Sequence, residues 1–175
     1  ALSRTARAPR PALSGAAGLG LRYVFAGFIN QKGAKEILNS YRNKFQTSSR
    51  KSGIQSPEAI LSVHVVCADT EEEARRQLAP VNVMYRNLSK GIIDAQLPSP
   101  DGAIKELGGL PKLEKYIAGS GVPPRFVAGT TKQVHEQLTQ LGKDLSVDEI
   151  IIQDMMTDHK ARLRSYDLLS NAFGL

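Results

Sequence analysis

The chain has 175 residues, of which 41% are hydrophobic and 23% are charged, and these values are ordinary for one globular domain with its own core. Its apolar runs fall short of the roughly 18 residues that a membrane-spanning helix needs, so no membrane segment is expected. The single cysteine, Cys67, excludes an internal disulfide and a multi-cysteine zinc site.

The net charge of +6 arises at the beginning of the chain. Residues 1–35 contain arginines and lysines but no acidic residue, and from Glu36 onward the basic and acidic side chains balance. A nucleic-acid-binding domain carries its basic residues on one face or stripe of the fold. Nucleic-acid binding is therefore not expected.

Residues 1–20 differ in composition from the rest of the chain, because they are rich in Ala, Arg, Gly, Ser and Pro and lack acidic and aromatic residues. Such a segment buries too little apolar surface to offset the entropy of ordering it. A flexible arm, an organelle-targeting peptide and a truncation of a longer protein all stay open. We expect a divergent or disordered arm over 1–20 and one folded unit over 21–175.

Strand-like and helix-like patterns alternate after this arm. Residues 22–28, 59–69 and 147–155 read as strands and 126–130 as a short extended piece, and helical patterns lie at 33–45, 70–91, 130–142 and 158–173. Pro80 is expected to kink or divide the second helix, and short helices are possible at 103–107 and 113–118. Alternation of this kind predicts an α/β fold with a parallel sheet. Three convincing strands are too few for a closed sheet, and a complete eight-stranded barrel needs about 250 residues, so we expect part of a larger fold.

Five segments occur together in a consistent order and spacing. They are GLRYVFAGFINQKGAKEILNSYRNKF (20–45), ILSVHVVCADTEEEARRQL (60–78), LPSPDGA (97–103), FVAGTTKQVHEQL (126–138) and VDEIIIQDMMTDHKARLRSYDLLSNAFGL (147–175). With them, residues 20–175 resemble the C-terminal part of bacterial luciferase-like, flavin-dependent monooxygenases. The resemblance implies the C-terminal part of a (β/α)₈ TIM barrel, with 22–28, 60–68 and 149–153 as strands six, seven and eight.

Two parts of the family pattern are missing from this chain. The N-terminal half, with a histidine-bearing segment near the flavin, is absent, so the catalytic residues are expected to lie there. Residues 1–20 also do not match the family's fifth strand, whose Gly-Ser-Ser-like turn helps to hold the FMN phosphate. No phosphate ligand is assigned to this chain.

The resemblance implies a cytoplasmic FMN-dependent monooxygenase that acts on a small organic substrate such as an aldehyde. Reduced FMN, supplied by a flavin reductase, would react with molecular oxygen, and the barrel would shield the product of that reaction from water. A deazaflavin-dependent oxidoreductase of the same fold and a non-catalytic partner subunit stay open. The chain alone is expected to be inactive, and to form a dimer or to pair with a missing half.

Small residues at the carboxyl end of the sixth strand, Ala26 and Gly27, are the candidate cofactor-binding residues, because they let a planar ring approach the backbone; simple turn geometry is the alternative. His64 could face the barrel interior near a flavin, but a histidine within an apolar run is more typical of a hydrogen-bonded core residue. Gln153, Asp154 and Thr157 follow the eighth strand and are candidates for the mouth of the site.

The other candidates favour structural roles. Gly129 and Thr130 precede a helix that could hold an anion, although this pattern is more typical of a helix cap. Cys67 lies in an apolar run and is interpreted as an inert core thiol rather than a nucleophile. No pair of histidines has the spacing of metal ligands near a Cys or Asp, so no metal site is expected.

Overall fold

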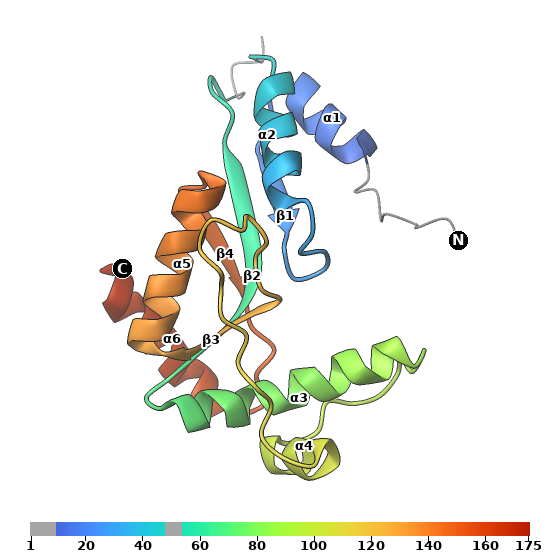
Figure 1. Cartoon of the computed structure of the whole chain (residues 1–175), viewed down its shortest axis with the longest axis vertical. Helices are drawn as coiled ribbons and strands as arrows, with labels where there is room; N and C mark the ends of the chain where they lie inside the picture. Colours follow the sequence, from blue (N-terminus) through green and yellow to red (C-terminus); the bar gives the residue numbers. More distant parts are fainter. Residues whose placement is uncertain (1–9, 48–53) are drawn as a thin grey trace.

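The computed structural model describes residues 10–47 and 54–175, which form a four-stranded parallel sheet flanked by helices (Figure 1). The strands are β1 (Tyr23–Ala26), β2 (Ala59–Ala68), β3 (Phe126–Thr130) and β4 (Glu149–Gln153). The helices are α1 (Arg10–Gly18), α2 (Ala34–Lys44), α3 (Glu71–Ser89), α4 (Pro100–Leu107), α5 (Thr131–Leu145) and α6 (His159–Phe173). The predicted α/β fold with a parallel sheet is confirmed.

Strand β2 is the centre of the sheet, and all ten of its residues are buried. Its first half pairs with β1 on one side and with β4 on the other, and its second half pairs with β3. The continuous apolar run of β2 is typical of a parallel strand that is covered on both sides. The order β1-β2-β4 places the three strands that the resemblance assigned to consecutive barrel positions next to one another.

One face of the sheet is covered over β1 and β2, and it is open at the β4 edge, where Ile152, in register with Val63, is 37% exposed. Side chains alternate between the two faces of a strand, and Phe25, Leu61, Val63 and Val65 point to the same face, where they join one apolar cluster with residues of α1, α2, α5 and α6. Val63 is 0% exposed and Val65 is 1% exposed. Most of the hydrophobic core therefore lies between the sheet and these helices.

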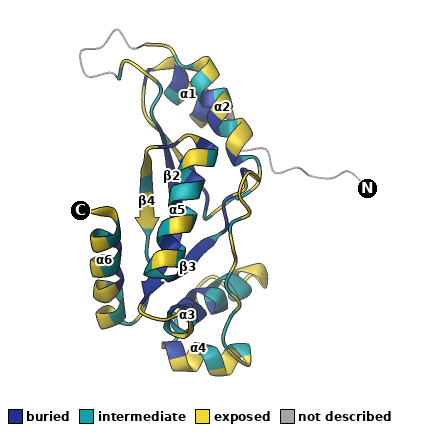
Figure 2. Cartoon of the chain, turned by 60° about the vertical axis from the view of Figure 1, so that its left-hand side comes forward, coloured by how far each residue is buried: buried dark blue, intermediate teal, exposed yellow. Residues whose placement is uncertain are grey.

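The opposite face is covered only at its carboxyl-terminal end. There α3 packs against Val66 and Ala68 of β2 and against β3. Nearer the amino ends of the strands lie Val24, Ala26, Ile60, Ser62 and Ile151, which we call the open face. Val24 is 44% exposed and Ile151 is 42% exposed, and Figure 2 shows β4 largely in the colour of exposed residues. Among the described residues, no helix covers this half of the sheet.

Part of the segment that we expected to be a flexible arm is an ordered helix. Residues 1–9 lie outside the described residues, but α1 buries Leu13 and Ala17 and lies beside α2 (Figure 1). Because α1 begins at Arg10, Pro11 lies in the first turn, where proline costs no hydrogen bond. The flexible-arm interpretation is therefore wrong for residues 10–18, and a domain boundary at residue 20 stays a prediction.

Two local expectations also need correction. Helix α3 runs from Glu71 to Ser89 with Pro80 inside it, so the expected division of the helix is wrong, whereas a kink at Pro80 stays a prediction. Pro80 is buried, and α3 packs along its length against α4, β2 and β3. Packing of this extent outweighs the local cost of one missing hydrogen bond. Residues 113–118 form no helix, whereas the predicted short helix at 103–107 is confirmed as part of α4.

Candidate functional site

The candidate site lies where β1 and β4 end beside the middle of β2, next to the open face. His64 of β2 pairs in register with Gln153, the last residue of β4, and with Phe126, the first residue of β3. The carboxyl ends of parallel strands are where α/β proteins place their ligand sites. His64 therefore marks the boundary between the open face and the part of the sheet that α3 covers.

Three aromatic side chains, from the turn after β1, from α3 and from β3, surround His64. Its ring stacks on Phe126, with 5.4 Å between the centroids, and also contacts Phe28 and Tyr85. Tyr85 comes from α3 and meets Phe126 edge to face at 5.6 Å. We call Phe28, His64, Tyr85 and Phe126 the aromatic cluster. It forms a wall of packed rings at the end of the open face.

Hydrogen bonds fix the orientation of the His64 ring. Its Nδ1 lies 3.4 Å from the carbonyl oxygen of Gln153, and its Nε2 lies 3.0 Å from the hydroxyl of Tyr85. Because a carbonyl only accepts, Nδ1 carries the proton in the neutral ring and Nε2 accepts from Tyr85. The Tyr85 hydroxyl also lies 3.4 Å from the carbonyl oxygen of Phe28. His64 is thus the packed, hydrogen-bonded core histidine that the sequence favoured, and it is 3% exposed.

Burial and a nearby cation keep this histidine neutral. Desolvation lowers the pKa of His64 below its ordinary value, and the positive charge of Arg125 lowers it further, whereas the Gln153 carbonyl and Asp154 act in the opposite direction. The guanidinium of Arg125 lies 4.3 Å from the centre of the Tyr85 ring. Burial raises the pKa of Tyr85. At neutral pH the cluster therefore holds an uncharged imidazole and an uncharged phenol beside one fixed cation.

The two candidate cofactor residues occupy different environments. Ala26 is half-buried and lies on the open face in register with Ser62, which in turn pairs with Ile151. Gly27 is buried, and its N–H donates to the Ser62 carbonyl at 2.8 Å. A Cβ on Gly27 would lie 3.1 Å from that oxygen. Gly27 therefore has a structural reason to be glycine, whereas Ala26 leaves free surface on the open face; a role of either residue in binding a cofactor stays a prediction.

The candidate residues at and after the end of β4 have different surroundings. Gln153 lies half-buried in the row of His64, and its Oε1 is buried with no hydrogen-bond partner among the described residues. Asp154 accepts from the Met156 N–H at 2.6 Å, and Thr157 donates to the carbonyl of Pro98. Asp154 Oδ2 is likewise buried with no hydrogen-bond partner among the described residues. Gln153 differs from Asp154 in its place, because it is the residue in register with His64.

The structural interpretations of Thr130 and Cys67 are confirmed. Thr130 and Gln133 form a complete capping box at the start of α5, which satisfies the backbone donors that an anion would use. Cys67 is 1% exposed, and burial raises the pKa of its thiol. Neither feature is available for chemistry at the open face.

The described part of the chain contains no group of three or more His, Cys, Asp and Glu side chains placed to hold a metal ion. Within the same ranges, none of the helices combines the length and the apolar character needed to cross a bilayer.

Sequence reasoning missed Tyr85, Arg125 and Phe28. Tyr85 lies on the helical face of α3 beside Met84, and nothing in its local pattern distinguishes it from a residue that packs against the sheet. Arg125 precedes β3 at the end of a segment rich in Gly and Pro. The sequence did offer one signal that could have indicated the cluster. An aromatic residue lies just after β1 (Phe28), and another lies at the start of β3 (Phe126).

Comparisons with known proteins point to one family. No protein-family model matches the chain. The uncharacterized protein YwcH of Bacillus subtilis is 32% identical over 158 residues, which are 90% of this chain and 46% of YwcH. A luciferase-like monooxygenase of Escherichia coli strain K12 is 26% identical over 153 residues, or 87% of this chain and 44% of the relative. The N-acetyl-S-alkylcysteine monooxygenase of B. subtilis is 28% identical over 90% of this chain and 45% of the relative.

Solved structures agree with these matches. The crystal structure of apo-MsnO8 superposes with a TM-score of 0.79 at 32% identity, and the match covers 98% of this chain and 53% of MsnO8. The oxygenating constituent of the 3,6-diketocamphane monooxygenase of Pseudomonas putida, solved in complex with FMN, superposes with a TM-score of 0.54 at 18% identity and covers 93% of this chain and 44% of that chain; at that identity it shows the fold alone. The chain spans about half the length of the curated relatives it matches. These comparisons confirm that the chain resembles the luciferase-like flavin-dependent monooxygenases and has homologues among them.

Proposed function

We propose that this chain is the C-terminal part of a (β/α)₈ barrel that works as an FMN-dependent monooxygenase on a small organic substrate. The observation that carries the proposal is the open face, which ends at the aromatic cluster at the carboxyl ends of β1 and β4. In a barrel this face would point inward, and the carboxyl ends of the strands would form the active-site mouth. The homologues named as monooxygenases support the reaction class.

The residues at the open face fit a planar, partly apolar cofactor. Ala26 is a small, half-buried residue on the open face and pairs in register with the buried Ser62. The buried Gln153 Oε1 lacks a hydrogen-bond donor within the described ranges. An N–H group on the edge of a flavin ring would satisfy that acceptor. The neighbour solved with FMN supports flavin as the group in question.

The chemistry would divide between the flavin and the protein. Reduced flavin supplies the electrons that activate oxygen. The part of this chain is to exclude water with Phe28 and Phe126, to hold the ring edge with Gln153, and to keep the wall uncharged through the His64–Tyr85 pair. Exclusion of water by an apolar wall protects reactive species from hydrolysis.

The test restores the missing length. The chain is joined to the part of YwcH that it does not match, and oxygen consumption is measured with FMN, NADH, a flavin reductase and either an aldehyde or a thioether. We expect consumption that depends on substrate and on FMN, and a loss of FMN affinity in Gln153→Leu with no loss in the control Gln96→Leu, since Gln96 lies exposed in the loop before α4. A chimera that folds and binds no flavin would contradict the proposal.

Two alternatives are outcomes of the same experiment. Tighter binding of a deazaflavin than of FMN by the chimera would assign the chain to a deazaflavin-dependent oxidoreductase. Stable association with a catalytic subunit, without flavin bound to this chain, would identify a non-catalytic partner subunit.

A further inference from the structure

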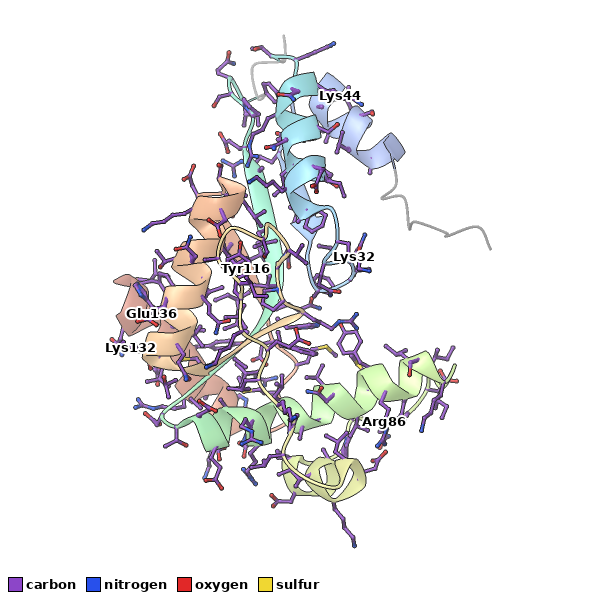
Figure 3. All side chains as sticks on the ribbon, viewed as in Figure 1. Lys32, Lys44, Arg86, Tyr116, Lys132 and Glu136 are labelled. Carbon is purple, nitrogen blue, oxygen red and sulfur yellow. The ribbon has the colours of Figure 1, made fainter. Side chains whose placement is uncertain are left out.

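A groove with an excess of positive charge adjoins the aromatic cluster. Its volume of about 820 Å³ lies in the range of small-molecule sites, and two loops line it. Gln31 and Lys32 come from the loop after β1, where Figure 3 labels Lys32. The other lining residues belong to the segment 114–125 before β3, and they include Lys115 and Arg125.

The acidic residues that line the groove do not balance its basic residues. Glu114 is its single acidic lining residue, and its Oε2 already accepts a hydrogen bond from the backbone N–H of Arg125 at 3.2 Å. The ion pairs found in residues 10–47 and 54–175 involve neither Lys32, Lys115 nor Arg125. Three cations therefore face one carboxylate, which leaves the groove attractive to an anion.

Arg125 connects this groove to the candidate site. Its guanidinium stacks on Tyr85, whose hydroxyl bonds to His64, and the residue is half-buried. Stacking restricts the arginine side chain and aligns its planar fork, and such a fork binds a carboxylate through two parallel hydrogen bonds. A group held by Arg125 would lie next to the aromatic cluster.

Apolar residues complete the lining. Ile117 and Val122 are 74% and 44% exposed, and the buried Pro123 and Pro124 lie along the chain between them and Arg125. Sites for small organic molecules combine apolar walls with a few placed polar groups. The groove has both, with Arg125 at the end nearest the cluster.

We propose that this groove binds the carboxylate of a small organic acid, with Arg125 as the main contact, Lys32 and Lys115 as supporting charges, and the hydrocarbon chain against Ile117 and Val122. The proposal deepens the proposed function by naming the substrate class. It rests on that function only in taking the bound acid to be the substrate of the monooxygenase. Binding of the acid itself requires no flavin.

The experiment is a nuclear magnetic resonance titration of the ¹⁵N-labelled 175-residue chain with hexanoate, hexanol and inorganic phosphate. We expect hexanoate to shift the Arg125 Nε–Hε signal and the amides of 30–33 and 114–126 in a saturable way, and hexanol to leave the Arg125 signal unchanged. Equal effects of hexanoate and hexanol would overturn the proposal. Saturable binding of phosphate but not of hexanoate would also overturn it, because the site would then recognise phosphate rather than an organic acid.

Variants separate the groove from general electrostatics. Arg125→Gln and the double variant Lys32→Gln/Lys115→Gln should each weaken hexanoate binding at least about fivefold, as expected for the loss of a charged contact. Lys112→Gln removes one charge just before the segment 114–125 and outside the groove lining. It should change the affinity less than about twofold, because exposed charges at a distance are screened. The double variant keeps the Arg125–Tyr85 contact and so tests the site even if Arg125→Gln disturbs the fold. Equal affinities in all the variants would refute the site.

The two proposals fail separately. If the chain binds hexanoate as expected but the chimera shows no flavin-dependent oxygen consumption, the monooxygenase function is contradicted and the acid site is still supported. If the chimera is active but the chain binds no hexanoate, only the acid site is contradicted.

Discussion

The hydroxyl of Tyr85 joins helix α3 to the central strand through His64. We expect Tyr85→Phe to lower the free energy of unfolding by about 1 kcal/mol, because the His64 Nε2 acceptor would lose its donor in a buried place. Tyr23→Phe is the matched control, since no hydrogen bond of the Tyr23 hydroxyl is found among the described residues and its ring stacks on Tyr41. Urea denaturation followed by circular dichroism measures both variants, and equal effects would mean that the Tyr85–His64 bond contributes nothing.

His64 makes the stability of the fold depend on pH. Its folded-state pKa lies below the ordinary value of 6.5, so below about pH 6.5 the unfolded chain binds a proton that the folded chain does not. Stability should therefore fall as the pH decreases from about 7.5 towards about 5. In His64→Gln this decrease should be smaller, and urea midpoints at the two pH values give the comparison. An unchanged slope in the variant would show that other groups cause the dependence.

At the scale of the element, the turn from β3 into α5 depends on Gly129. This residue has a φ of 150°, and a Cβ there would collide with Oε1 of Gln133, the side chain that completes the capping box with Thr130. We expect Gly129→Ala to destabilise the fold by about 2 kcal/mol, from backbone strain and loss of the box.

Gly15→Ala provides the control for that substitution. Gly15 lies exposed in α1, and a Cβ added to it would meet no heavy atom within 4 Å. This variant should be more stable than the parent by about 0.5–1 kcal/mol, because alanine favours a helix. Thermal unfolding of both variants tests the pair. A Gly129→Ala protein as stable as the parent would show that the turn tolerates a side chain.

At the scale of the whole molecule, the open face leaves apolar side chains of two edge strands exposed to solvent. Val24 and Ile151 are exposed on β1 and β4, each of which has β2 as its only partner strand in the described residues. Unpaired edges and apolar surface of this kind favour association with another chain. We propose that the chain forms a dimer or pairs with a missing half through this face.

Light scattering after size-exclusion chromatography tests the association. The apparent mass should rise with concentration, and Val24→Lys/Ile151→Lys should hold the chain nearer to its monomer mass of 19.0 kDa. Ile93→Lys is the control, because Ile93 is 75% exposed in the loop after α3. A parent chain that stays monomeric at every concentration would contradict the role of the open face.

The elements followed from the sequence where a local signal was strong. The parallel sheet was predicted from the unbroken apolar run of β2 and from the alternation of strands with amphipathic helices. The helix cap at Thr130 was predicted from its position before a helix. Helix α1 was missed because its stability comes from packing Leu13 and Ala17 against the rest of the fold, which its own composition does not reveal. The expected division of α3 at Pro80 was wrong for the same reason, since tertiary contacts hold the helix together.

The sequence by itself determined the fold class, the resemblance to luciferase-like monooxygenases and the candidates on single strands, Ala26, Gly27 and His64, because periodicity and motif order are local properties of the chain. Only the tertiary structure decided which side chains contact one another at the site. It placed Tyr85 against His64 from 21 residues away and brought Arg125 over Tyr85. These contacts depend on how α3 and the segment before β3 cross the sheet, and no local pattern encodes that crossing.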